Sequence, residues 1–292
     1  MGRPLFLLGS LPMYLMGAAA AWRDGHGVEP AKLVLGMLLV WLIQLMTHYN
    51  NEYCDLKTDQ ATQATTRISG GSRVLVRGLV PRQRARMSAV ATLALAMVVL
   101  ATLAAVSHVG NLLFLFAGAA AFVGWFYSAP PLALESKGLG EIAIVFVTAS
   151  LLPSTAYYIQ ASAVSPALVL ACAPLALIVL SLTIATGLPD VSADVATGKM
   201  TIVARLGEKR ALWLHNSVLA MGWLGFNAWT ASFRLSPGWF AIAGTAPMVA
   251  VVAASLKGAG KGNMKAMERM GMAEGVLLSW IALSVGAQFL LE

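Results

Sequence analysis

The stretch AKLVLGMLLVWLIQLMTHYNNEYCDLKTD, residues 31–59, joins an almost uncharged apolar run to a short acidic segment. The apolar run is about as long as an α-helix must be to cross the hydrocarbon core of a membrane. Directly after it, Asn51, Asp55 and Asp59 follow one another at intervals of four residues. On a helix this spacing places the three side chains on one stripe. The stretch therefore predicts a membrane helix that ends in a polar site.

The composition of the whole chain indicates an integral membrane protein. Of the 292 residues, 58% are apolar and only 11% are charged, whereas soluble domains carry about 25% charged residues. Because lipid cannot satisfy unpaired backbone groups, continuous apolar runs indicate helices. We therefore expect an all-α bundle of nine transmembrane helices, over residues 5–22, 31–50, 87–107, 111–128, 139–160, 166–187, 211–230, 238–256 and 273–291.

The positive charges gather in alternate links between these segments. Sixteen lysines and arginines lie in the links after the second, fourth, sixth and eighth segments, whereas the other links hold only Arg23, Lys32 and Arg234. By the positive-inside rule, the N-terminus and the basic links lie in the cytoplasm and the C-terminus lies outside. The net charge of +7 is spread between apolar segments. This distribution favours membrane lipid or a phosphate-bearing ligand as partner, and no nucleic acid.

A second acidic pair follows the sixth segment. Asp190 and Asp194 stand in LPDVSAD, again four residues apart and again followed by a basic link. The chain thus reads as a single domain, 1–292, with two loosely repeated four-helix units (about 5–130 and 139–256) and a ninth helix. Units of the same orientation place both acidic ends on the cytoplasmic side.

Clustered carboxylates indicate a metal site. Like charges this close raise one another's pKa unless a cation neutralises them, and hard oxygen ligands select Mg²⁺ or Ca²⁺. Mg²⁺ commonly completes its shell with phosphate oxygens, so two facing acidic pairs predict Mg²⁺ bridging a diphosphate. The SGGSR loop (69–73), flanked by Arg67 and Arg73, offers phosphate contacts, as does Lys199 in TGKMT.

Together these motifs resemble the UbiA superfamily of intramembrane prenyltransferases. The likeness covers nearly the whole chain and rests on NEYCDLKTD, DVSAD, SGGSRVLVRGLV, FYSAPPLALESKGLGE and GKMTIVARLG. The SGGSR loop and PDVSADVATGKMT are most similar to the branch that acts on 1,4-dihydroxy-2-naphthoate. The resemblance implies a helical bundle whose central cavity is capped by cytoplasmic loops. It also implies a bacterial or archaeal cell membrane, with the active site toward the cytoplasm.

The resemblance also assigns residues to roles. It implies Mg²⁺ ligands at Asn51, Asp55, Asp59, Asp190 and Asp194; diphosphate contacts at Asn51, Arg67, Arg73, Lys199 and Lys137; and catalytic residues at Asp55, Asp59, Asp190, Asp194 and Tyr127. The chain departs from the family pattern at three positions. Glu52 replaces an Asp, Ala133 stands where relatives often carry a basic residue, and Thr186 replaces an Asn. The change at Ala133 leaves Lys137 as the basic residue expected from that loop.

The expected activity is Mg²⁺-dependent transfer of a polyprenyl group from an allylic diphosphate to an aromatic acceptor. Our best candidate for the acceptor is 1,4-dihydroxy-2-naphthoate, in menaquinone biosynthesis. A terpene cyclase of the same family, or a prenyltransferase with a 4-hydroxybenzoate-like acceptor, stays open, because the diphosphate half of the site would be identical. A cation or lipid-phosphate transporter is disfavoured, since its ionisable groups would lie near the membrane midplane. A scaffold that binds the diphosphate without turnover is a further alternative.

Overall fold

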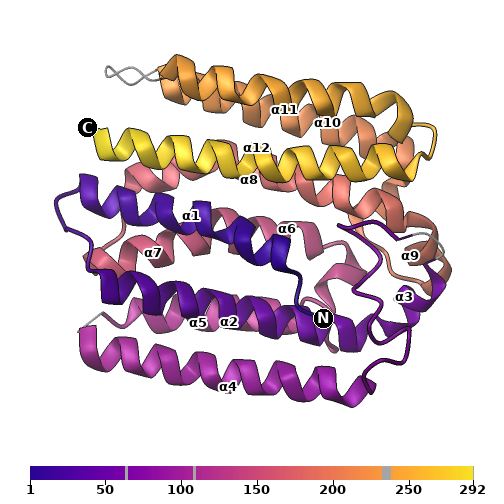
Figure 1. The fold of residues 1–292 in the computed structure, drawn as a ribbon, viewed down its shortest axis with the longest axis horizontal. Helices are drawn as coiled ribbons and strands as arrows, with labels where there is room; N and C mark the ends of the chain where they lie inside the picture. The colour runs from indigo at the N-terminus through magenta and orange to yellow at the C-terminus, as the bar shows by residue number, and fades with distance from the viewer. Residues whose placement is uncertain (63–64, 108–109, 232–237, 292) are drawn as a thin grey trace.

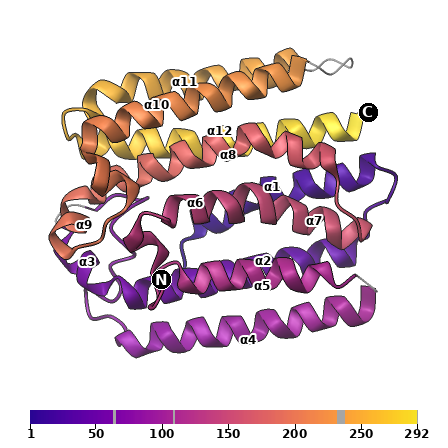
Figure 2. The ribbon, with the colours of Figure 1, turned by 180° about the vertical axis from the view of Figure 1, so that it is seen from behind.

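The structure, a computed structural model, describes residues 1–62, 65–107, 110–231 and 238–291, and within them the chain is a bundle of helices (Figures 1 and 2). The α-helices are α1 (Pro4–Arg23), α2 (Pro30–Cys54), α3 (Leu56–Ala61), α4 (Arg82–Ser107), α5 (Leu112–Phe126), α6 (Gly140–Val145), α7 (Leu152–Ala161), α8 (Pro166–Gly187), α9 (Val191–Thr197), α10 (Ile202–Ala231), α11 (Gly238–Ala259) and α12 (Met264–Leu291). Two 3₁₀ turns, η1 (Leu134–Lys137) and η3 (Leu188–Asp190), and one π-helical segment, η2 (Phe146–Leu151), complete the order.

Proline marks the starts of several long helices. Pro4, Pro30 and Pro166 each lie in the first turn of their helix, where the missing N–H would have no intrahelical partner anyway. The side chain of Ser165 caps α8 by accepting from the Leu168 N–H at 3.5 Å. In α10 the helix is interrupted at Gly207, whose φ of 72° and ψ of 161° are not helical. The segment expected at 211–230 is therefore the part of α10 beyond this kink.

Six helical segments in the described part of the chain are long and apolar enough to cross a membrane. They are Pro4–Arg23, Pro30–Cys54, Arg82–Ala105, Gly140–Ala161, Pro166–Thr197 and Met264–Leu291. They coincide with six of the nine expected segments. Two further apolar helices, Leu112–Phe126 and Ala243–Ala259, are shorter, and α10 is not among the candidates. The all-helical membrane class is thus supported, while the count of nine spans is not established.

The packing of the bundle brings the two acidic motifs to one end. Helix α2 packs against α4, α8 against α10, and α12 against both α11 and α1. The short helices α3 and α9 contact each other, and both lie at the end of the bundle that also holds the N-terminus (Figures 1 and 2). The last turn of α12 lies at the opposite end. Residues 55–59 and 190–194, far apart in sequence, are therefore neighbours.

A buried polar cluster ties three long helices together. Glu274 of α12 accepts a hydrogen bond from the Ser181 hydroxyl of α8 at 2.8 Å. Its other oxygen lies 2.5 Å from His215 Nε2 of α10. All three residues are fully buried. Because an unpaired polar group is costly in the interior, loss of any one of them would leave its partners buried without a hydrogen bond. The cluster fixes α8, which carries the second acidic motif at its end, against α10 and α12.

Close approach of α1 and α7 depends on a small residue. A Cβ added at Gly17 would overlap the backbone carbonyl of Pro153, whereas a Cβ at Gly9 of the same helix meets nothing within 4 Å. We expect Gly17→Ala to destabilise the protein by about 1–3 kcal/mol because the helices must separate. Gly9→Ala should be neutral, or stabilising by about 0.5–1 kcal/mol. Thermal unfolding in detergent measures both, and an equal effect of the two changes would contradict this packing.

Candidate active site

The first acidic motif straddles a break between two helices. Helix α2 ends at Cys54, Asp55 adopts φ −85° and ψ 5°, and α3 begins at Leu56. The Asp59 N–H still donates to the Asp55 carbonyl at 2.9 Å. Because α2 ends at Cys54 and α3 begins at Leu56, the expected single stripe is interrupted at Asp55. Helix α3 then runs across the end of the bundle toward α9 (Figure 1).

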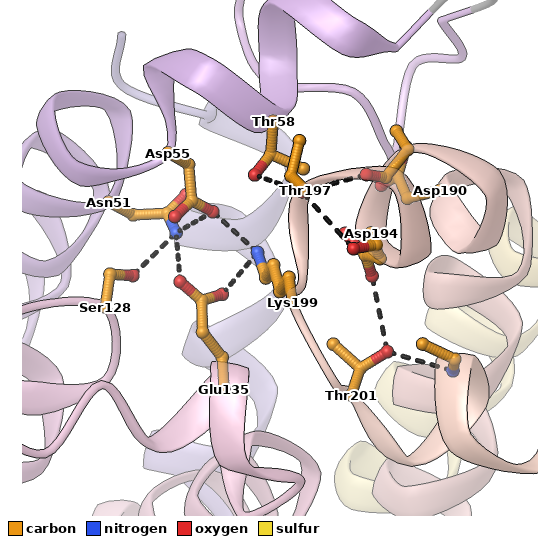
Figure 3. Close-up of polar contacts among 12 residues, drawn as sticks. Asn51, Asp55, Thr58, Ser128, Glu135, Asp190, Asp194, Thr197, Lys199 and Thr201 are labelled. Carbon is orange, nitrogen blue, oxygen red and sulfur yellow. Dashed lines mark hydrogen bonds and ion pairs between the residues drawn. The ribbon is translucent and has the colours of Figure 1, made fainter.

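The second acidic motif faces the first from η3 and α9. Hydroxyl groups of Thr58 in α3 and Thr197 in α9 lie 3.1 Å apart. One carboxylate oxygen of Asp190 accepts from the Gly70 N–H at 3.2 Å, which links the second motif to the loop after the first. Asp194 accepts from the Thr201 hydroxyl at 3.3 Å. Figure 3 shows the two motifs on either side of one polar region.

Lys199 lies at the centre of this region. Its ammonium nitrogen is 2.6 Å from Asp55 Oδ2 and 2.8 Å from Glu135 Oε2 (Figure 3). Burial alone would lower the pKa of Lys199, but the Glu135 and Asp55 carboxylates outweigh it and hold that pKa well above its ordinary value. Lys199 is therefore a fixed positive charge. Its placement follows from Gly198, which ends α9 in the left-handed conformation with φ 77°.

Asn51 completes the network on the α2 side. Its amide nitrogen donates to Asp55 Oδ2 at 3.0 Å, to the Ser128 hydroxyl at 2.8 Å and to Glu135 Oε1 at 3.4 Å. Ser128 and Glu135 both come from the segment between α5 and α6. Three separate parts of the chain thus meet around one lysine.

Tyr127 lies at the start of the same segment. Its carbonyl oxygen accepts from the Glu135 N–H at 3.0 Å, so the tyrosine backbone helps to place the carboxylate.

The SGGSR loop is held by Glu52, the residue that departs from the family pattern in the first motif. The Glu52 carboxylate is buried, and it accepts from the Ser72 N–H at 2.8 Å and the Ser72 hydroxyl at 2.6 Å. Gly70 and Gly71 have φ of 77° and 69°, and a Cβ on Gly71 would overlap the Asp59 carboxylate. Glycine is therefore required where this loop passes the acidic motif.

Three of the basic residues expected at the diphosphate have partners other than the acidic side chains of the two motifs. The Arg67 side chain is 80% exposed and lies 3.8 Å from Glu268. The Arg73 guanidinium donates to the main-chain carbonyls of Asp59 and Thr62. Lys137 is exposed and donates to the Pro131 carbonyl at 3.0 Å. The structure thus brings Lys199, and not Arg67, Arg73 or Lys137, to the Asp55 carboxylate.

A polar cavity of about 310 Å³ opens beside Asp55 and Lys199. It is lined by Cys54, Asp55, Lys57, Thr58, Ser128, Ser136, Thr197, Gly198 and Lys199. Hydroxyl groups and lysines are suited to phosphate oxygens, because each supplies a donor and the lysines supply opposite charge. The cavity therefore fits the anionic part of a ligand.

The carboxylates suit a divalent cation that arrives with a phosphorylated ligand. Asp190 Oδ1 is buried and has no hydrogen-bond partner in the described residues, which is uncommon for a carboxylate oxygen. Among the same residues, no three acidic, histidine or cysteine side chains gather closely enough to enclose an ion by themselves. Mg²⁺ typically takes one or two carboxylates and fills its shell with water and phosphate. The donor set fits that requirement.

Sequence reasoning missed Glu135 and Ser128. Both stand in FYSAPPLALESKGLGE, a stretch that was recognised as a motif without a role for either residue. The available signal was a carboxylate in a short loop expected on the same side as the acidic motifs. Sequence alone does not show that the loop turns Glu135 inward and Lys137 outward.

A model of the UbiA prenyltransferase family matches residues 10–273. The chain belongs to this family. Its predicted class, a membrane-bound prenyltransferase, is confirmed by this membership.

Three known proteins are similar to this chain at 20–29% sequence identity. The 1,4-dihydroxy-2-naphthoate octaprenyltransferase of Escherichia coli (strain K12) is 29% identical over 226 residues, which cover 74% of this chain and 70% of that protein. The apo structure of a UbiA homolog from Aeropyrum pernix K1 has a TM-score of 0.68 and 20% identity, covering 94% of this chain and 98% of that one. A UbiA homolog from Archaeoglobus fulgidus, bound to GPP and Mg²⁺, has a TM-score of 0.64 and 20% identity, covering 97% of each chain. These structures share the fold.

In this UbiA-family protein, Glu52 should control the order of the SGGSR loop. Glu52→Ala leaves the Ser72 N–H without its acceptor, so we expect its amide to lose about 1–3 kcal/mol of protection against hydrogen exchange. Glu29→Ala is the control, because Glu29 pairs with Lys32 at the far end of α2. Unchanged exchange at Ser72 in Glu52→Ala would show that the carboxylate does not hold the loop.

Proposed function

We propose that the protein transfers a polyprenyl group from an allylic diphosphate to 1,4-dihydroxy-2-naphthoate, a step of menaquinone biosynthesis. The observation that carries the proposal is the meeting of both acidic motifs around Lys199 and a polar cavity, with Lys199 2.6 Å from Asp55. The name of the Escherichia coli relative supports the acceptor, at 29% identity. The prenyl diphosphate and Mg²⁺ bound by the Archaeoglobus fulgidus homolog support the donor and the metal.

The reaction breaks the bond between the prenyl carbon and the diphosphate oxygen, and the electron pair leaves with the diphosphate. The aromatic ring supplies the electron pair for the new carbon–carbon bond, and a proton is then lost from the ring. Lys199, a fixed positive charge in the cavity, can stabilise the negative charge that develops on the leaving group. Thr58, Thr197 and Ser136 lie in the cavity wall. The Thr197 hydroxyl donates to the Ala193 carbonyl at 2.8 Å, so the Ser136 hydroxyl is the one that would donate to a phosphate oxygen.

Asn51, Asp55 and Asp59 on one side, and Asp190 and Asp194 on the other, would hold Mg²⁺. Bound there, Mg²⁺ supplies positive charge to the diphosphate. The buried Asp190 Oδ1 without a partner supports this assignment. Around the site, Tyr127 and the membrane-embedded bundle exclude water, which protects a reactive prenyl cation from capture.

The membrane arrangement belongs to the same proposal. A single domain of two repeated units, with nine spans, places the N-terminus and the acidic motifs in the cytoplasm and the C-terminus outside. The N-terminus and the acidic motifs lie at one end of the bundle and the last turn of α12 lies at the other, which supports this orientation (Figure 1). The isoprenoid chain would then reach the site from the lipid.

Purified protein with Mg²⁺, geranylgeranyl diphosphate and 1,4-dihydroxy-2-naphthoate should release diphosphate and form a prenylated product, identified by mass spectrometry. Asp55→Asn and Asp190→Asn should each lower the rate at least about 100-fold, because each removes a carboxylate that would hold the Mg²⁺ on the diphosphate. Glu208→Gln, on the exposed face of α10, should retain the wild-type rate.

The outcome without acceptor distinguishes the alternatives. A cyclised hydrocarbon formed in the absence of acceptor would identify a terpene cyclase. Product formation with 4-hydroxybenzoate alone would correct the acceptor. No diphosphate release under any of these conditions would refute the proposed transfer and leave the transporter or scaffold hypothesis.

Metal binding should depend on pH near neutrality. Burial, followed by the charges of Asp55 and Glu52, raises the pKa of Asp59 to about 7. A proton and a cation compete for this carboxylate, so Mg²⁺ affinity should fall as pH falls below about 7, approaching tenfold per pH unit for one displaced proton. Isothermal titration calorimetry with a diphosphate analogue at pH 6 to 8 measures it. Asp59→Asn should bind more weakly with a flatter pH dependence, and a flat wild-type profile would contradict the assignment.

A further inference from the structure

Glu135 is a carboxylate of the site that belongs to neither acidic motif. It lies in η1, in the loop between α5 and α6, and is only 3% exposed. Burying a carboxylate is costly unless it is paired, and this one has two partners from other parts of the chain. Figure 3 shows it rising from its own loop toward Lys199 and Asn51.

The loop is shaped to present this side chain. Ala133 and Gly138, on either side of η1, both have left-handed conformations, with φ of 43° and 72°. For Ala133 this conformation is uncommon and costs energy. A Cβ on Gly140 would lie 2.7 Å from the Glu135 Cα, so glycine allows the loop to close. These local costs indicate that surrounding contacts impose the path of the loop.

The same loop is attached to the segment that follows Lys199. The Met200 N–H donates to the Ser136 carbonyl at 3.2 Å, and the Arg205 guanidinium donates to the Lys137 carbonyl at 3.0 Å. Glu141 accepts from the Ile202 N–H at 2.9 Å. Glu135 and Lys199 are therefore carried by two backbones that are joined to each other.

The two oxygens of Glu135 have different partners. Oε2 lies 2.8 Å from the Lys199 ammonium, and Oε1 accepts from the Asn51 amide at 3.4 Å. Glu135 and Asp55 both accept from the Asn51 amide nitrogen, which holds this nitrogen on their side.

Asp55 would be shared between two cations. In this structure its Oδ2 pairs with Lys199 at 2.6 Å, while the proposed function, on which this inference rests, also assigns Asp55 to the diphosphate-bound metal. A cation on the other oxygen would weaken the attraction between Asp55 and Lys199, and Glu135 is the second carboxylate in contact with Lys199 among the described residues.

We infer that Glu135 is a positioning residue: it keeps Lys199 directed into the cavity when Asp55 is shared with the metal. It does not touch the reacting atoms and acts through Lys199. The effect of removing its charge must then depend on whether position 199 carries a lysine. If Glu135 only filled buried space, replacing it would have the same effect whether or not residue 199 is a lysine.

A double-mutant cycle tests this dependence. Glu135→Gln should lower kcat about tenfold or more and raise KM for the prenyl diphosphate, a size typical of coupled residues in one ion-pair network. In a Lys199→Met background the same change should have little further effect. Glu135→Asp keeps the carboxylate but moves it away from Lys199 by one methylene group, so it should give an intermediate loss of kcat. It replaces Glu135→Gln in the test if that variant does not fold.

The matched control is Glu141→Gln. Glu141 is also buried and also lies at the end of this loop, but it bonds to the Ile202 backbone rather than to Lys199. Its effect, whatever its size, should be the same in the wild-type and Lys199→Met backgrounds. Equal proportional losses for Glu135→Gln in both backgrounds, or no loss at all, would overturn the inference.

Binding separates this inference from the proposed function. Calorimetry with a non-hydrolysable prenyl thiolodiphosphate and Mg²⁺ should show weaker binding for Glu135→Gln, and no further weakening when Lys199→Met is already present. This cycle can be measured even if no acceptor is turned over. A wild type that binds the analogue without transferring a prenyl group would sink the proposed transfer alone, whereas additive binding losses would sink the role of Glu135 alone.

Discussion

The ammonium of Lys199, held between Asp55 and Glu135, is the interaction on which the geometry of the site depends. It joins the end of α2, the loop before α6 and the segment after α9, and Lys199 stands 144 residues beyond Asp55 in the chain. Removing one partner of such a group leaves the others buried and uncompensated. The three elements are therefore held in one arrangement beside the polar cavity.

Much of this architecture could be predicted from the sequence. Continuous apolar runs indicated the membrane class, and six of the expected segments coincide with helices long enough to span. The spacing of Asp55 from Asp59, and of Asp190 from Asp194, together with the matching positions of the two motifs, predicted that both would lie at one end of the bundle. The helices could be predicted because they depend on local periodicity, which is a property of the chain itself. The shared end of the two motifs follows from the even number of segments between them.

Loop geometry could not be predicted in the same way. Arg67, Arg73 and Lys137 carry the expected charge, but the paths of their loops turn them toward solvent, toward backbone carbonyls or toward Glu268. Arg73 shows the reason: the carbonyls at the end of α3 need donors, and a nearby guanidinium supplies them. Charge composition thus indicates a phosphate ligand in general, while the contacts of each arginine are decided by backbone needs that spacing does not reveal.

The contact between α1 and α12 has a consequence for synthesis in the cell. These are the first and the last helices of the described chain, and Gly286 of α12 lies against Met16 and Ala19 of α1. A helix in lipid satisfies its own backbone hydrogen bonds, so α1 can wait in the membrane without its neighbour. The contact between them nevertheless forms only after α12 has been made. A chain interrupted within α12 would therefore leave the face of α1 that packs against α12 open to lipid, although α1 can already contact α7.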